Sequence, residues 1–158
     1  MATSVRPARD DDRGFIDALG KQTALETVSP IRGMSRREAE NAYDRLVAFC
    51  RERPGTVTFV AETDGRPSGF LIFVTDIPDD VTQLPQGFIA YVAVAQDQRK
   101  HGVGRTLVQA AVAEGLRRKL PHVSLMVSAE NVIARSLYES ELFAPERTLM
   151  TRRLEANP

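Results

Sequence analysis

The stretch "AYVAVAQDQRKHGVGRTL", residues 90–107, joins an apolar run to a basic turn that contains two glycines. The run "FIAYVAVA" at 88–95 is typical of a buried strand, and residues 103–119 repeat their apolar positions at helical spacing. The first backbone N–H groups of a helix have no partner inside the helix, so a turn at this place can hold an anion. The stretch predicts a strand, a turn and a helix, with a candidate anion site at the turn.

Two common glycine motifs do not fit this turn. A P-loop places Lys and then Ser or Thr directly after its last glycine, whereas Gly104 is followed by Arg105 and Thr106. A dinucleotide-binding fingerprint keeps a third glycine at the position that Leu107 occupies here. These differences argue against an ATPase and against a nicotinamide-binding oxidoreductase. From spacing alone, an anion site and a solvated basic connection are equally compatible with the turn.

The remaining elements follow one another without a repeat or a low-complexity linker. Ser35 and Glu38 form a capping box at the start of a predicted helix, and turn residues at 64–69 separate the two strands of a predicted hairpin. The predicted helices cover 9–24, 36–51, 103–119 and 130–143, and the predicted strands cover 56–63, 70–76, 88–95, 122–129 and 147–154. A hairpin is antiparallel and a β–α–β unit is parallel. We therefore expect a single α/β (α+β) domain over residues 1–158, with a mixed central sheet flanked by helices.

Composition narrows the class of protein. Lys plus Arg and Asp plus Glu both number 21, so no global charge indicates a nucleic acid or an anionic membrane as partner. Cys50 lies on the apolar stripe of the predicted helix 36–51, which favours a core position over a nucleophile. No apolar run is long enough to cross a bilayer, and the N-terminal residues lack the apolar middle of a secretory signal. We expect a cytoplasmic enzyme or binding protein without a metal site.

Two motifs together resemble those of the Gcn5-related N-acetyltransferases (the GNAT superfamily). The run Arg99-Lys100-His101-Gly102-Val103-Gly104 fits R/Q-x-x-G-x-G/A, the acyl-CoA pyrophosphate loop of that family. The run "SAENVIARSLYESELF", residues 128–143, resembles the second family signature, in which an Asn opens a helix and a Tyr follows. The resemblance implies the GNAT acyl-CoA N-acyltransferase fold. It also implies an acetyltransferase that moves an acetyl group from acetyl-CoA to a primary amine of a small molecule or peptide, by direct attack in a ternary complex.

The resemblance also assigns roles to residues. It implies that the backbone of Val92, Ala93 and Val94 binds the pantetheine arm. It places the pyrophosphate on the backbone amides of the turn, with Lys100 and Arg105 as additional charges; the turn residues are Arg99, Lys100, His101, Gly102, Val103 and Gly104. Asn131 and Tyr138 are seven residues apart and so project from one helix face, where Asn131 meets the pantetheine and Tyr138 gives a proton to the leaving thiolate. The competing interpretation of Tyr138 is a core aromatic.

The general base is not assigned. Many family members carry a Glu or Asp in the strand before the pyrophosphate loop, and here that strand has no carboxylate. Tyr91, Glu62 and a water chain are the alternatives, and a catalytically weak acyl-CoA-binding module or sensor is the alternative function. Residues 24–35 and 76–87 are expected to line the acceptor site, where Glu26, Asp76, Asp79 and Asp80 either attract a cationic amine or are simply solvated. A homodimer is a further expectation, with strand 147–154 at its edge.

Overall fold

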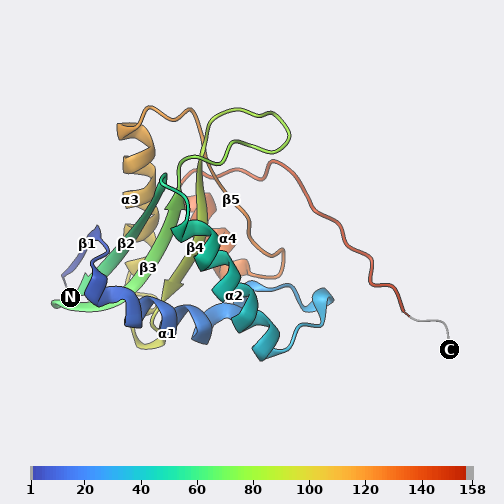
Figure 1. The fold of residues 1–158 in the computed structure, drawn as a ribbon, viewed down its shortest axis with the longest axis horizontal. Helices are drawn as coiled ribbons and strands as arrows, with labels where there is room; N and C mark the ends of the chain where they lie inside the picture. The colour runs from blue at the N-terminus through green and yellow to red at the C-terminus, as the bar shows by residue number, and fades with distance from the viewer. Residues whose placement is uncertain (1, 156–158) are drawn as a thin grey trace.

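The central feature of the chain is a five-stranded sheet, seen in a computed structural model that describes residues 2–155 (Figure 1). The strand order is β1-β2-β3-β4-β5. Strands β1 to β4 pair antiparallel with one another, whereas β5 pairs parallel with β4. The strands are β1 (Thr3–Pro7), β2 (Thr56–Thr63), β3 (Arg66–Val74), β4 (Gly87–Val94) and β5 (Val123–Leu125). The predicted mixed sheet is therefore confirmed.

Helices cover both faces of the sheet and enclose two cores (Figure 1). The helices are α1 (Arg13–Thr23), α2 (Arg36–Arg51), α3 (Val103–Arg117) and α4 (Val132–Ser140). On one face, α1 and α2 pack on Val60, Phe70 and Ile72. On the other face, α3 packs on Leu71 and Phe73, and the predicted capping box of Ser35 and Glu38 opens α2. Because β3 lies between the two layers, its run from Ser68 to Val74 is buried on both sides, as the continuous apolar pattern requires.

An irregularity in β4 changes which way its side chains point. Tyr91 lies opposite Ile72 and Ile89 lies opposite Phe73, so Ala90 is an extra residue and β4 has a bulge. Ala90 and Tyr91 both pack toward α1 and α2, whereas Ile89 packs toward α3. Strands β4 and β5 are paired only from Gly87 to Ile89. Among residues 2–155, the backbone from 90 to 94 consequently has no neighbouring strand on the β5 side.

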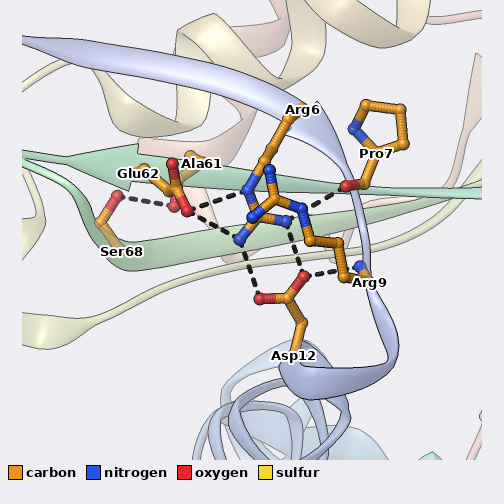
Figure 2. Close-up of polar contacts among 7 residues, drawn as sticks. All are labelled: Arg6, Pro7, Arg9, Asp12, Ala61, Glu62 and Ser68. Atoms are coloured by element: carbon orange, nitrogen blue, oxygen red, sulfur yellow. Dashed lines mark hydrogen bonds and ion pairs between the residues drawn. The ribbon is translucent and has the colours of Figure 1, made fainter.

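An ion cluster fixes β1 against β2 and the start of α1 (Figure 2). The Arg6 guanidinium donates to both carboxylate oxygens of Asp12, at 2.7 and 3.0 Å, and to Glu62 at 2.7 and 2.9 Å. The backbone N–H of Arg9 donates to the same Asp12 carboxylate at 2.7 Å. Asp12 is almost completely buried, and the hydrogen bonds from Arg6 hold the pKa of its carboxyl below its usual value. The cluster is a structural clamp whose polar groups are satisfied.

At the ends of the chain, one strand was not predicted and one prediction is wrong. Strand β1 was not predicted, because five residues with one apolar inward position are too short to show alternation. The predicted last strand, 147–154, is an extended segment that joins no strand in the described part of the chain. Its anchors are side chains: Arg147 donates to Asp79 and Asp80, and Arg32 donates to Thr151. Strand β5 and helix α4 are also shorter than predicted.

Candidate functional site

The candidate anion site lies where β4 passes through a short 3₁₀ helix, η4 (Gln96–Gln98), into α3. Lys100 and Gly102 have left-handed backbones, with φ of 66° and 82°. Thr106 is the first residue of this region whose backbone N–H finds a helical partner, the carbonyl of Gly102. Within residues 2–155, the N–H groups of 100–105 donate to no protein acceptor. Several free amide donors therefore gather at the positive end of the α3 dipole, which suits an anion.

Glycine fits positions 102 and 104 for different physical reasons. A Cβ on Gly102 would meet no atom within 4 Å, so its glycine is explained by the positive φ alone. A Cβ on Gly104 would lie 3.2 Å from the Leu137 side chain and 3.7 Å from Val94. Gly104 thus allows α4 to approach α3 and β4 closely. Positive φ thus accounts for Gly102, and close helix packing accounts for Gly104.

The two arginines of the turn are held in ion pairs. Arg99 donates to the carbonyl of Val94 at 3.2 Å and to the Glu26 carboxylate at 3.0 Å, so its side chain points to the α1 side. Arg105 donates to Glu141, just beyond α4, at 2.8 Å. Arg105 is thereby fixed between α3 and α4. The charges of both arginines are partly compensated, so the backbone amides are the main anion donors.

Lys100 and His101 are both exposed. Neither side chain has a hydrogen bond or an ion pair with the described residues. Val103, by contrast, is buried in the core beneath α3. Lys100 is therefore the cation of the turn that is available to an incoming anion.

Asn131 lies at the start of the helix that carries Tyr138. It is the N-cap of α4, with φ of −80° and ψ of 72°, and its Oδ1 accepts from the Ala134 N–H at 3.2 Å. Its side-chain oxygen is therefore engaged in capping, a general role for Asn before a helix. The contact of Asn131 with a pantetheine arm stays a prediction.

Tyr138 lies inside α4 and packs on the core beneath α3. Its ring makes an edge contact with Phe143, with centroids 6.0 Å apart, and it belongs to the same cluster as Val92 and Val94 of β4. Its hydroxyl has no hydrogen-bond partner among the described residues. Burial raises the pKa of this phenol above its ordinary value. A partly buried phenol with an unengaged hydroxyl, beside the stretch of β4 that β5 does not pair with, can donate a proton.

The two side chains considered as bases are engaged elsewhere. The Tyr91 hydroxyl donates to the Gly20 carbonyl at 3.0 Å and lies 3.0 Å from the Thr23 hydroxyl, and its ring stacks on Phe70. Burial raises the pKa of Tyr91 as well. Glu62 lies on β2, two strands away from β4, and forms an ion pair with Arg6. The structure argues against both residues as the base.

The two stretches expected to line the acceptor site, residues 24–35 and 76–87, contact residues that follow β5. Residues 24–35 form η2 (Ala24–Thr27) and η3 (Pro30–Arg32), and Ser128 donates to the Thr27 carbonyl from the loop after β5. Hydrogen bonds from Thr82 and Arg147 lower the pKa of Asp79 to about 2. The four acids named from the sequence all have cationic partners: Glu26 with Arg99, Asp76 with Arg53, and Asp79 and Asp80 with Arg147. Each of these carboxylates would have to break its ion pair before it could bind a cationic amine.

A cavity of about 210 Å³ lies between the end of α1 and the β4–α3 turn. Its lining is mainly polar and comes from Leu19, Gln22, Thr23, Glu26, Arg36, Gln96 and Arg99. No group of three or more His, Cys, Asp or Glu side chains that could bind a metal is found among residues 2–155. No helix in that range is long and apolar enough to span a bilayer.

Comparison with known proteins agrees with this geometry. The model of the acetyltransferase (GNAT) family matches residues 25–142. A proposed acetyl transferase from Pyrococcus furiosus has a TM-score of 0.80 at 18% identity, covering 97% of this chain and 100% of that one. A complex of AAC(6')-Iy with the bisubstrate analogue CoA-S-monomethyl-acetylneamine has a TM-score of 0.72 at 17% identity, covering 99% and 100%. A ribosomal-protein-alanine N-acetyltransferase from Brucella melitensis biovar Abortus 2308 has a TM-score of 0.66 at 21% identity, covering 98% and 100%. No curated protein matches the sequence.

Proposed function

Because the chain belongs to the acetyltransferase (GNAT) family and is an acyltransferase of that type, we propose that it moves an acetyl group from acetyl-CoA to a primary amine. The acceptor is a small molecule or a peptide, and the amine attacks directly in a ternary complex. The observation that carries this proposal is the row of unpartnered amides at 100–105, directly after a strand whose edge is unpaired from 90 to 94.

These two features match the two halves of an acyl-CoA. A diphosphate accepts hydrogen bonds from several backbone N–H groups at once, and the dipole of α3 favours its charge. The amides of a pantetheine arm can pair with the free backbone edge of β4 as an added strand would. The bulge at Ala90 lies where the pairing of β4 with β5 ends, and the thioester would lie near this point.

The proposed chemistry needs one acid. The neutral amine nitrogen attacks the thioester carbonyl carbon, and the C–N bond forms as the carbonyl electrons move to oxygen. When the tetrahedral intermediate collapses, the C–S bond breaks and the thiolate takes the proton of the Tyr138 hydroxyl. The nitrogen loses its extra proton to water, and the Tyr138 phenolate is reprotonated from solvent.

Ligand-induced stabilisation tests cofactor binding. Acetyl-CoA should raise the melting temperature, and acetyl-pantetheine, which lacks the diphosphate, should raise it much less. Lys100→Glu brings a negative charge to the turn and should weaken the acetyl-CoA shift. Arg13→Glu is the matched control, because Arg13 is an exposed cation at the start of α1, on the opposite face of the sheet from α3. An unchanged melting temperature at saturating acetyl-CoA would refute the proposal.

A catalytically weak acyl-CoA-binding module or sensor is the second candidate function. The observation in its favour is that β4 has no carboxylate and that Tyr91 and Glu62 are held in structural contacts. Release of free thiol from acetyl-CoA across a panel of amines separates the two functions. The panel should include aminoglycosides and peptides with an N-terminal alanine, in view of the structural neighbours. Turnover that falls in Tyr138→Phe supports the enzyme, and inactivity across the panel supports the sensor.

A further inference from the structure

A second cavity lies at the opposite end of the sheet from the turn at residues 99–104. Its volume is about 500 Å³, and it is lined by the β1–α1 connection, the end of α2 and the start of β2. Thr56 at the start of β2 pairs with Val74, and Val74 pairs with Phe88 at the start of β4. The turn follows Val94 at the other end of β4, about 20 Å away along the strand at about 3.3 Å per residue. The cavity is therefore separate from the proposed acyl-CoA site.

The cavity forms where the chain leaves β1. The Ala8 N–H donates to the Thr58 carbonyl at 2.8 Å, and within the described chain no backbone hydrogen bond joins residues 56–57 to residues 8–12. The start of β2 is therefore not covered by β1. A cavity of this size lies in the range of sites that bind small molecules.

The floor of this cavity is apolar. It is formed by Ile16 of α1, Val47 and Cys50 of α2, and Ile72 of β3, which all belong to the core beneath the two helices. An apolar group in the cavity would extend this core and leave water, which contributes about 25 cal/mol for each Å² of apolar surface removed. The floor therefore suits the apolar part of a ligand.

The rim of the cavity carries charge. Its charged side chains are Arg9, Asp10, Arg13 and Arg51. Arg51 donates to the Asp17 carboxylate at 2.9 Å, so its charge is compensated. Within residues 2–155, the side chains of Arg9, Asp10 and Arg13 make no hydrogen bond or ion pair. Two uncompensated arginines and one uncompensated aspartate leave one positive charge at the rim, which a ligand with a single negative charge would balance.

We propose that this cavity binds a small amphiphilic carboxylate, a molecule with an apolar chain and one carboxylate group. The chain lies on the apolar floor, and the carboxylate binds the guanidinium groups of Arg9 and Arg13. A guanidinium can donate two parallel hydrogen bonds to a carboxylate, which gives this pairing its strength and direction. The backbone of Arg9 is already fixed, because its N–H donates to the buried Asp12 carboxylate at 2.7 Å (Figure 2). Because the ligand contacts both α1 and α2, it should stabilise the folded chain.

Binding of octanoate to the full chain tests the proposed site. Octanoate should raise the melting temperature and give a one-to-one isotherm in titration calorimetry. Acetate lacks the apolar chain, octanol lacks the charge and octylamine has the opposite charge, so each should bind much more weakly. Saturating acetyl-CoA should leave the octanoate isotherm unchanged, because the two sites are separate. Absence of octanoate binding, equal binding of octylamine, or loss of octanoate binding with acetyl-CoA would overturn the proposal.

Two charge reversals distinguish this site from the acyl-CoA site. Arg13→Glu replaces attraction by repulsion at the rim and should weaken octanoate binding by about tenfold or more, while the acetyl-CoA shift remains. Lys100→Glu should weaken the acetyl-CoA shift and leave octanoate binding unchanged. Arg45→Glu is the matched control, because Arg45 is an exposed arginine of α2 that lies outside the cavity and has no ion pair within the described chain.

Filling the cavity tests its apolar part. Thr58 lines the cavity from β2, and Thr58→Trp should abolish octanoate binding in a chain that still unfolds cooperatively and still responds to acetyl-CoA. If Thr58→Trp does not fold, Arg13→Glu decides alone, since a glutamate in the first turn of α1 suits the helix dipole and should not disturb the fold. Octanoate binding that survives Arg13→Glu at full affinity would show that the carboxylate binds elsewhere, and the proposal would be wrong.

Discussion

Two tyrosine hydroxyls on opposite sides of β4 are expected to have different roles. Replacing Tyr138 by phenylalanine should lower turnover and leave stability unchanged, whereas replacing Tyr91 by phenylalanine should lower stability and leave turnover unchanged. Tyr138→Phe removes a hydroxyl that has no partner among the described residues, whereas Tyr91→Phe removes one held by Gly20 and Thr23. Both rings remain in place as phenylalanine, so the packing of each core is preserved. The pair of variants therefore separates a chemical role from a structural one.

For Tyr138→Phe, no intramolecular hydrogen bond is lost, so the free energy of unfolding should change by less than about 0.5 kcal/mol. General acid catalysis contributes roughly 10²- to 10⁴-fold. We expect the low end, a fall in kcat of about 100-fold or about 2.7 kcal/mol in the barrier, because a thiolate leaves fairly well without a proton. The KM for acetyl-CoA should stay within a factor of a few, since the hydroxyl is used only as the C–S bond breaks.

For Tyr91→Phe, two buried hydrogen-bond contacts are lost and the Gly20 carbonyl loses a donor. The expected destabilisation is about 1–2 kcal/mol, which for a chain of this size lowers the melting temperature by roughly 2–8 °C. Its kcat below the unfolding range should match that of the parent.

Thermal unfolding and thiol release, measured on the same preparations, distinguish a chemical role of each hydroxyl from a structural one. A Tyr138→Phe enzyme with kcat within twofold of the parent would refute the general-acid role. A Tyr91→Phe enzyme that keeps its melting temperature and loses turnover would show that the Tyr91 hydroxyl has a chemical role, contrary to the structural one inferred from its hydrogen bonds. Tyr43→Phe is a further control, because its hydroxyl donates to the Ile16 carbonyl within the same core.

Three other predictions address pH and the glycine turn. Because Arg6 lowers the pKa of Asp12, the stabilisation by Asp12 is fully present above its unfolded value of about 3.9 and is lost as pH falls through the lower folded value. Asp12→Asn should therefore lower the free energy of unfolding by about 3 kcal/mol at pH 7. In urea unfolding, the stability of this variant should fall less than that of the parent as the pH is lowered. Because burial raises the pKa of the Tyr138 phenol above its ordinary value, the phenol stays protonated at neutral and mildly alkaline pH, and kcat for a fully neutral amine should not fall in a pH–rate profile over that range. Gly102→Ala should cost about 1–2 kcal/mol through its positive φ, measured by urea unfolding, whereas Gly104→Ala should be nearly neutral because the gain in helix propensity offsets the contact with Leu137.

Local signals in the sequence account for the elements that were predicted well. The capping box of Ser35 and Glu38 gives the start of α2, and the turn between β2 and β3 gives the hairpin. The last segment shows the limit of such signals. "RTLMTRRL" alternates as a strand does, but pairing needs a neighbouring edge, and alternation carries no information on where that edge is. The sequence thus indicated the conformation of 147–154 without its partner.

The candidate site was predictable in position and less so in detail. The glycine spacing predicted an anion site at the start of α3, and amides without a backbone partner lie there among the described residues. The bulge at Ala90 was not visible, because an extra residue in an apolar run leaves the run apolar. The engagement of Tyr91 was also hidden, since its partners on α1 are 68 and 71 residues away in sequence. Side-chain partners brought together by the fold decide which of several plausible groups is free to react.

The bulge and the two tyrosines together constrain the proton balance. The bulge turns both Ala90 and Tyr91 toward α1 and α2, and the Tyr91 hydroxyl is held there. In the proposed mechanism, the side of β4 that faces α4 has an acid, Tyr138, and β4 itself has no ionisable side chain on that side. Such a site would protonate the departing thiolate but would not deprotonate the attacking amine, so the amine would have to be neutral by its own pKa. At pH 7.5 roughly a third of a peptide α-amine is neutral, against about one in a thousand for a lysine side chain, a difference of about 300-fold in reactive species. On the proposed mechanism we therefore expect faster turnover with acceptors whose amine has a low pKa, such as a peptide N-terminus or an amine beside electron-withdrawing groups.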